Sequence, residues 1–365
     1  MSDIERKIKD RFAPDILTFK SGRAVVTQTD FEKRRKEILS LISEHEYGIL
    51  PERPDHLRVE PVTTDRTFAA GKATFSELKF TVTVGERELS FPVHAVIPNK
   101  DEKMPAFVKI ANEPQIPNKF LPAEEISDCG FAVFSFLFSD ITDENSDFSR
   151  GFAKLLSPAR RKLNSPGKIL MWSWAAMRVM DYLEALDYID SDGVAVIGHG
   201  VLGTAALLAG AHDERFKYVI SNSSGTSGAA ITRGKRGENL ANIALYRDFL
   251  FCPRYKSYVT NENSLPLDQH FLLAAIAPRH ILVGSAKEDS NSDFESEFLS
   301  TYLAGEVYEK IYGIPSFKDL DEVPKAPVSV DRERLHYHLR DGLSYLSRED
   351  WAAYINYIKE HRKKR

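Results

Sequence analysis

Hydrophobic positions along the chain follow two different patterns. Before residue 100, alternating or β-branched runs occur at 58–62, 78–84 and 91–97, and this spacing of two predicts strands of an antiparallel unit. From Pro105 onward, short apolar runs are separated by helical patterns, which is typical of buried parallel strands joined by crossover helices. The apolar runs are 106–110, 131–136, 194–197, 218–220, 280–283 and 335–339.

A helical period marks several of the remaining segments. We expect helices over 31–42, 169–186, 204–210 and 348–358. In the second of these, Trp172, Trp174, Met177 and Met180 fall at helical spacing, the pattern of a core-facing stripe. The order of elements predicts an α/β-hydrolase fold, a three-layer sandwich with a mostly parallel central sheet and an antiparallel N-terminal entry. We expect a single domain over 1–365, with residues 1–50 as a helical extension packed on it.

A sharp strand-to-helix turn lies within residues 194–209. A strand rich in valine and isoleucine leads into Gly198, His199 and Gly200, and small apolar residues follow. In the G-x-S-x-G form of this turn, a serine occupies the strained position and its hydroxyl stands above the carboxyl edge of a parallel sheet. Gly200 holds that place here. Glycine adopts the strained backbone at little cost but has no side chain to attack a carbonyl, so the sequence predicts a nucleophile elbow without its nucleophile.

Composition and charge narrow the class of protein. The 365 residues are 42% hydrophobic, enough to bury one large core or two modest ones. The 49 basic and 53 acidic residues give a net charge of −4 and are spread along the chain, which offers no basic surface for nucleic acid or an anionic membrane. The first residues lack the apolar core of a secretion signal, and no run approaches the ~18 apolar residues of a membrane span. We therefore expect a cytoplasmic protein.

Long ordered blocks extend over nearly the whole chain. They are Met171–Leu183, Ser224–Glu238, Leu265–His270, Ile276–Arg279, Tyr337–Arg340 and Ser347–Trp351, with Tyr47-Gly48. Together these blocks resemble the bacterial branch of the glucuronoyl esterases, carbohydrate esterases that cleave the 4-O-methylglucuronate esters linking xylan to lignin. The resemblance implies the same fold and a sugar-binding cleft at the strand ends.

The resemblance also shows what this chain lacks. In that family the elbow usually reads GHSRxGK, where the serine attacks, the arginine helps to hold the oxyanion and the lysine contacts sugar hydroxyls. Gly200, Val201 and Thr204 stand at those positions. Ser223 replaces the acid of a pattern like SNDSGCSGAA, and Ser344 replaces the base of a loop like RxGxHxLSxxDW.

Two further positions complete this reading. Asn291 stands where the family has a sugar-facing tryptophan, and Asp289, at the alternative acid position, is retained. A triad works as a unit, and loss of one member alone costs on the order of a million-fold in rate in the best-studied case. We therefore expect a pseudoenzyme with no intact catalytic set, no cofactor and no metal. Its cleft would take a carbohydrate, a small acidic ligand or a partner protein, and the candidate ligand contacts are Thr204, Arg233, Lys235, Glu238, Gln269 and Asn291.

Other interpretations remain open. An active carboxylic ester hydrolase of altered chemistry would use Asp289 with a histidine such as His199 or His270. A structural subunit would pair with an active paralogue or with its own copies. His199 also fits a hydrogen-bonded structural role, and the charged group at 233–238 fits an anchor for its loop as well as a ligand contact.

Two smaller features have a structural and a chemical reading. Asp268 precedes a helical segment, where it can cap backbone N–H groups. His336 and His338 are two positions apart on an expected strand, so their side chains share one face, as metal ligands sometimes do. No adjacent cysteine or acid completes a recognisable metal pattern in the sequence.

Overall fold

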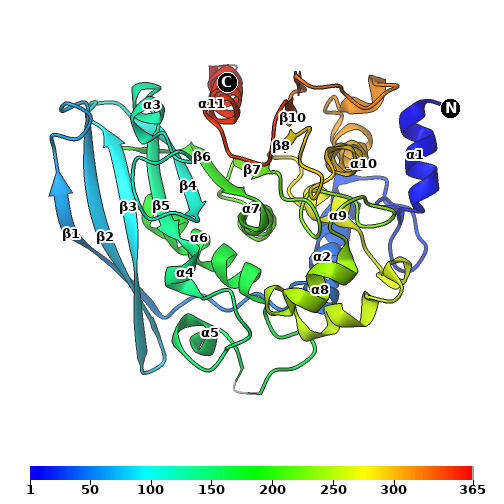
Figure 1. The fold of residues 1–365 in the computed structure, drawn as a ribbon, viewed down its shortest axis with the longest axis horizontal. Coiled ribbons are helices and arrows are strands. Elements are labelled where there is room, and N and C mark those ends of the chain that lie inside the picture. The colour runs from blue at the N-terminus through cyan, green and yellow to red at the C-terminus, as the bar shows by residue number, and fades with distance from the viewer. Residues whose placement is uncertain (159, 364–365) are drawn as a thin grey trace.

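The computed structural model describes residues 1–158 and 160–363, which form a mixed sheet of ten strands with helices on both faces (Figure 1). The spatial order is β1-β2-β3-β5-β4-β6-β7-β8-β10-β9. Strands β5, β4, β6, β7, β8 and β10 pair in parallel, whereas β1–β3 and the edge strand β9 pair antiparallel. The predicted parallel centre and antiparallel entry are therefore both present. The strands are β1 (His56–Asp65), β2 (Ala73–Val84), β3 (Arg87–Pro98), β4 (Met104–Ala111), β5 (Ala132–Leu137), β6 (Ile189–His199), β7 (Tyr218–Asn222), β8 (His280–Ala286), β9 (Val328–Asp331) and β10 (Leu335–Arg340).

The helices fall into two layers. Figure 1 shows α11 and α3 together on one side of the sheet, with α6, α7 and α10 on the other. The helices are α1 (Asp3–Arg11), α2 (Gln28–His45), α3 (Ala123–Asp128), α4 (Phe138–Ile141), α5 (Gly151–Leu155), α6 (Lys168–Leu183), α7 (Val201–His212), α8 (Leu240–Tyr246), α9 (Gln269–Ala274), α10 (Phe294–Tyr312) and α11 (Arg348–Lys363). Short 3₁₀ helices cover Asp248–Leu250, Pro253–Tyr258, Glu262–Ser264 and Phe317–Asp319. No helix among the described residues is long and apolar enough to cross a bilayer.

The larger core lies between the sheet and the α6–α7–α10 layer. Trp172 and Trp174 of α6 are fully buried in it, which confirms the core reading of the tryptophan and methionine stripe. The N-terminal segment joins the same core, because Ile4 of α1 and both Phe31 and Ile38 of α2 are buried in it. Burial of these side chains is the main favourable contribution to holding α1 and α2 against the body.

The α11 side of the sheet has a smaller apolar core and more polar groups. Phe107, Ile197 and Ile220 point to this side and pack under Trp351 and other residues of α11. Farther along the same strands, toward their carboxyl ends, the alternation places polar side chains on this side. This polar end of the α11 face surrounds the candidate site.

Helix α10 and strand β9 were not predicted. Ser296, Glu297, Ser300 and Thr301 of α10 are buried together with its apolar residues. A helix that is buried on most sides loses the amphipathic period by which sequence analysis finds helices. Strand β9 covers only Val328–Asp331, too short for a periodic signal.

Candidate active site

The elbow keeps its backbone and has no side chain at its apex. Gly200 joins β6 to α7 with φ 59° and ψ −136°, a conformation that L side chains rarely adopt. The turn is tight, because a Cβ at Gly198 would lie 2.0 Å from the carbonyl oxygen of Leu202. A Cβ at Gly200 would meet no heavy atom within 4 Å beyond its chain neighbours. The position that bears a nucleophile in a G-x-S-x-G elbow is therefore open and empty of side-chain atoms.

The acid position after β7 holds a buried hydroxyl. Ser223 has φ 47° and donates its backbone N–H to the carbonyl of Gly284 at 2.7 Å. Its Oγ is buried and has no hydrogen-bond partner among the described residues. A hydroxyl in this place carries no charge, so it cannot stabilise a protonated base as a carboxylate does.

The retained carboxylate, Asp289, lies in the turn after β8. Its oxygens accept hydrogen bonds from Ser292 Oγ at 2.6 Å and from the backbone N–H groups of Asn291 and Ser292 at 3.0 and 3.1 Å. Burial acts to raise the pKa of Asp289, but the hydrogen bonds from Ser292, Ser344 and the backbone outweigh it and hold the pKa below its ordinary value. Ser344, at the base position, therefore lies beside an ionised carboxylate. The alternative acid position, Asp289, and the base position, Ser344, are therefore neighbours in the fold, but the base position holds a serine in place of a histidine.

The histidines named as alternative bases are held in other ways. His199 Nδ1 lies 2.7 Å from Asn222 Oδ1, and its ring stacks on Phe120 with ring centroids 6.3 Å apart. Burial lowers the pKa of His199, with Lys109 acting in the same direction and Asn222 opposing. His270 is buried, and its Nε2 pairs with the carbonyl of Pro14 at 2.9 Å. The contact between His199 and Asn222 agrees with a structural role for His199. The contact between His270 and the carbonyl of Pro14 joins α9 to the N-terminal segment.

Four of the six candidate ligand residues are buried or held by contacts within the protein, and the other two, Asn291 and Glu238, are more accessible. Thr204 is buried, and its Oγ1 would lie 2.7 Å from a Cβ at Gly228. Arg233 is buried; its guanidinium pairs with Asp268 at 2.9 Å and donates to backbone carbonyls of 263, 265 and 267. Lys235 Nζ donates to the carbonyls of 236, 238 and 291. These contacts anchor the loop, which was one of the two readings of the charged group.

Gln269 belongs with the anchored residues. Its side chain is fully buried, donates to Glu46 Oε1 at 2.8 Å and accepts from the Tyr47 hydroxyl at 3.3 Å. By contrast, Asn291 is exposed and Glu238 is half-buried. The loops that carry these two side chains touch, because Lys235 bridges their backbone carbonyls. The side chains of Asn291 and Glu238 are thus accessible to solvent, and their role as ligand contacts stays a prediction.

The rest of the rim is formed by the loop after β10. Val201 is half-buried at the start of α7, and Leu343 is 71% exposed. The Tyr345 ring packs on Phe120 with centroids 5.0 Å apart, and its hydroxyl donates to the carbonyl of Lys119 at 2.6 Å. Leu343 is therefore turned to solvent, and the space at a Cβ of Gly200 is free of heavy atoms within 4 Å beyond the chain neighbours.

Sequence analysis also missed residues near the site. Glu297 of α10 is buried and accepts hydrogen bonds from the N–H of Gly225 at 2.9 Å and from Ser285 Oγ at 2.5 Å. Burial raises the pKa of Glu297 to about 7, against the opposing hydrogen bond from Ser285. Lys109 of β4 is buried, and burial lowers its pKa to about 8. A charged residue inside an otherwise apolar segment, as at Lys109, was the one signal in the sequence.

Two residues assigned to chemistry or capping can now be placed. Asp268 is the N-cap of α9 and accepts from the Gln269 N–H at 2.8 Å, which confirms the capping prediction. His336 and His338 do share a face, but each ring holds a β9 partner through Nδ1, Asp331 and Ser329 respectively. Among residues 1–158 and 160–363, no cluster of three or more His, Cys, Asp or Glu side chains has the arrangement of a metal site.

Comparison with known proteins places this geometry in a family. The family model described as "Glucuronyl esterase, fungi" matches residues 80–312. The chain belongs to the glucuronoyl esterase family. Glucuronoyl esterase from Solibacter usitatus has the same α/β-hydrolase fold, with a TM-score of 0.88 and 27% identity over 96% of this chain and 97% of that one. A promiscuous CE15 esterase from a marine bacterial metagenome has a TM-score of 0.86 and 28% identity, with 96% of each chain covered.

Two curated relatives match this chain over part of their own length. Carbohydrate esterase MZ0003, from an unknown prokaryotic organism, is 39% identical over 53% of this chain and 44% of its own length. The 4-O-methyl-glucuronoyl methylesterase of Podospora anserina is 27% identical over 74% of this chain and 54% of its own. The chain thus spans about half the length of these relatives. A Sporotrichum thermophile glucuronoyl esterase, 23% identical with a TM-score of 0.69 over 96% of this chain and 88% of its own, has been solved in complex with methyl 4-O-methyl-beta-D-glucopyranuronate.

Proposed function

We propose that this chain is a non-hydrolytic member of the glucuronoyl esterase family that binds a carbohydrate or small acidic ligand in its cleft. The observation that carries the proposal is Gly200. The strained backbone of the elbow is retained and the space above it is open, but no nucleophile stands there. The base position, Ser344, has no imidazole to take a proton from a nucleophile.

The family's substrates suggest the ligand class. Relatives are named 4-O-methyl-glucuronoyl methylesterases, and one is solved with a methyl glucuronate ester. We therefore expect the ligand to carry a carboxylate, several sugar hydroxyls or both. The exposed Asn291 and half-buried Glu238 offer an amide and a carboxylate to sugar hydroxyls.

Hydrolysis is tested first. The purified chain is assayed with a methyl glucuronate ester and with activated aryl esters, beside an active glucuronoyl esterase. We expect no turnover above a heat-killed control. Turnover that survives purification and disappears on Asp289→Ala would overturn the proposal in favour of an altered hydrolase.

Ligand binding is tested separately by thermal unfolding with glucuronate and with methyl glucuronate. A ligand that binds only the folded state raises the free energy of unfolding by RT ln(1 + [L]/Kd), and Tm therefore rises with ligand concentration. We expect a concentration-dependent rise that Asn291→Ala and Glu238→Ala both weaken. No shift with either ligand, together with co-purification of an active homologue, would instead identify a structural partner.

A further inference from the structure

Two lysines among the described residues are almost fully buried, and their ammonium groups differ in what they contact. Lys109 of β4 and Lys168 of α6 are each 1% exposed. Lys168 Nζ donates to the carbonyl of Asp143 at 2.7 Å and to Asn145 Oδ1 at 3.1 Å. Lys109 Nζ has no hydrogen bond or ion pair with any described residue, yet it is not among the unpaired atoms that are sealed from solvent. The tip of Lys109 is therefore open to a partner that the described chain does not supply.

The charge on Lys109 is poorly compensated within the protein. Glu113, in the loop after β4, is the acidic residue whose charge acts on Lys109, but its carboxylate pairs with Lys119 at 3.8 Å. Burial lowers the pKa of Lys109 to about 8, with Glu113 opposing, so the side chain is still mostly charged at pH 7. A buried charge without a partner costs free energy, and a bound anion reduces that cost.

The sheet places Lys109 next to the elbow. Phe107 and Ile197 point to the α11 side, and the alternation along β4 and β6 puts Lys109 and His199 on that side as well. Lys109 is opposite Ile197, and His199 lies two residues farther along β6. Strand spacing and rise then separate the Cα atoms of Lys109 and His199 by about 8 Å, a gap that the four-carbon stem of lysine can largely span. His199 directly precedes Gly200, so the ammonium group belongs to the elbow end of the sheet.

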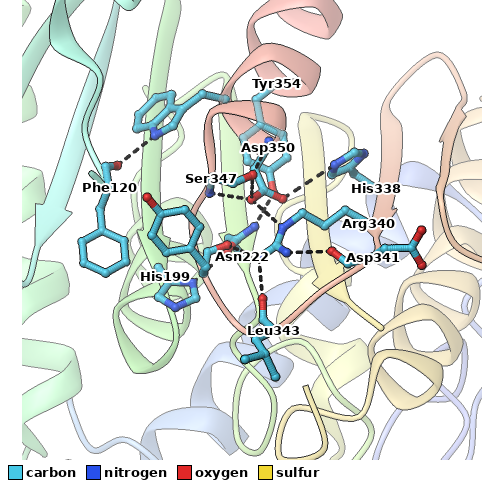
Figure 2. Close-up of polar contacts among 12 residues, drawn as sticks. Phe120, His199, Asn222, His338, Arg340, Asp341, Leu343, Ser347, Asp350 and Tyr354 are labelled. Atoms are coloured by element: carbon cyan, nitrogen blue, oxygen red, sulfur yellow. Dashed lines mark hydrogen bonds and ion pairs between the residues drawn. The ribbon is translucent and has the colours of Figure 1, made fainter. Parts of the chain in front are cut away.

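The His199 ring is oriented by contacts that leave one of its nitrogens free. Asn222 Nδ2 donates to the Tyr354 hydroxyl at 2.9 Å, so Asn222 Oδ1 is the atom that faces His199 Nδ1 at 2.7 Å (Figure 2). With this orientation of the amide, Nδ1 of the neutral ring carries the proton and Nε2 is a hydrogen-bond acceptor. His199 Nε2 has no hydrogen-bond partner among the described residues and is not sealed from solvent. Lys109 and His199 thus offer a cation and an acceptor at the ends of adjacent strands.

This pair of groups matches a carboxylate with neighbouring hydroxyls. In a G-x-S-x-G hydrolase the serine attacks the carboxyl carbon, so that carbon lies above the elbow. A free carboxylate there forms a charge-assisted hydrogen bond with the Lys109 ammonium, whereas a neutral ester carbonyl forms a weaker one. A sugar hydroxyl beside the carboxylate is a donor for His199 Nε2.

We propose that Lys109 is the carboxylate-binding residue of the cleft and that it makes the chain select a free uronic acid over the corresponding ester. The inference rests on the proposed function, because it names the ligand of the same cleft. The preference is opposite to the one that hydrolysis needs, since an esterase has to bind the ester and release the acid.

Stability without ligand is measured first, on Lys109→Met and on the matched variant Lys168→Met. Methionine keeps an unbranched, flexible side chain and removes the charge. Thermal unfolding at pH 7 should give Lys109→Met a Tm equal to or above that of the wild type, because an unpaired buried charge is removed. Lys168→Met should lower Tm, because two oxygens lose their donor. If Lys109→Met loses as much stability as Lys168→Met, or does not fold, Lys109 is a structural residue and the inference is wrong.

Binding is then measured by calorimetry at pH 7 with glucuronate and with its methyl ester. The wild type should bind glucuronate about tenfold or more tightly than the ester, as expected for one hydrogen bond to a charged group. Lys109→Met should abolish this preference, and Lys168→Met should keep it. Equal affinities in the wild type, or a preference that survives in Lys109→Met, would overturn the inference and leave the proposed function standing. Binding of neither compound would instead overturn the proposed function, and this inference with it.

A readout without loss of the amine uses NMR of the wild-type chain. The ε-methylene resonance of Lys109, assigned with Lys109→Arg, should move when glucuronate is added and move less with the methyl ester. The ε-methylene resonance of Lys168 should stay in place with both compounds. If glucuronate saturates the protein while the Lys109 resonance does not move, the carboxylate is held elsewhere and the inference is wrong.

Discussion

The two faces of the central sheet are packed against different kinds of side chain. Against α6 and α7, the core is formed by apolar side chains, with tryptophan, leucine, alanine and methionine among them. Against α11, near the carboxyl ends of the strands, His338, Arg340, Asp350 and Tyr354 meet in a buried polar cluster. The first face is held by non-directional burial, which tolerates change as long as volume is kept. The second depends on the pairing of particular atoms, so loss of one partner leaves another buried and unsatisfied.

The largest effect should come from breaking the α11 cluster. Asp350→Ala removes the acceptor of Arg340 Nε and of Ser347, and it leaves a buried guanidinium without its carboxylate partner. We expect the free energy of unfolding to fall by about 3–5 kcal/mol, measured by urea denaturation. Glu125→Ala is the matched control, because it breaks the exposed pair with Arg348 and should change stability by less than about 1 kcal/mol. Equal effects of the two variants would show that the cluster is not an energetic unit.

On the apolar face, Leu208→Ala of α7 should cost about 2–5 kcal/mol through lost burial and a residual cavity. The cost should be the same at pH 5.5 and pH 7.5, because neither leucine nor alanine has a titratable side chain. Urea denaturation at both pH values measures it. A cost that changes with pH would mean that the two faces are coupled and would break the comparison.

At the elbow, Gly200→Ser should lower stability by ~1–3 kcal/mol, because serine must adopt a backbone region that glycine occupies freely. Activity should not return, since Ser344 and Ser223 supply neither base nor acid. The combined set Gly200→Ser, Val201→Arg, Ser223→Asp and Ser344→His restores the missing roles, and hydrolysis of aryl esters by it would support the pseudoenzyme reading. Burst kinetics from the single variant would instead show that a base is already in place.

The smallest effect should be that of Glu297→Gln at pH 5, within about 0.5 kcal/mol of the wild type. Burial raises the pKa of Glu297 to about 7 in the folded chain, above the ordinary value of ~4.3. The folded state therefore binds this proton more tightly, and wild-type stability falls as pH rises from about 4.5 through about 7. Thermal unfolding should show Glu297→Gln as the more stable protein at pH 8. A variant that is less stable at pH 8 than the wild type would contradict this.

The positions of the candidate site could be predicted because the resemblance to the glucuronoyl esterases assigns them to particular residues. Gly200, Ser223, Ser344 and Asp289 occupy positions defined by ordered blocks of sequence. The anchoring roles of Arg233 and Lys235 could not be separated from ligand contacts in advance, because a long cationic side chain can reach either a neighbouring carbonyl or the solvent. Only the folded loops show that backbone carbonyls occupy their donors. Whether the ligand readings of Asn291 and Glu238 are right stays a prediction.

The sequence by itself determined the antiparallel entry, the run of parallel strands and the sharp turn at Gly200, and it determined which residues stand at the positions that the resemblance assigns to the triad. These depend on local periodicity and on residue identity, which are written directly in the chain. Tertiary structure decided the buried helix α10, the short edge strand β9 and the cluster of His338, Arg340 and Asp350. Their chemistry depends on distances between elements far apart in the chain, such as the 3.6 Å between His338 and Asp350. Such distances are set by packing, and no local pattern encodes them.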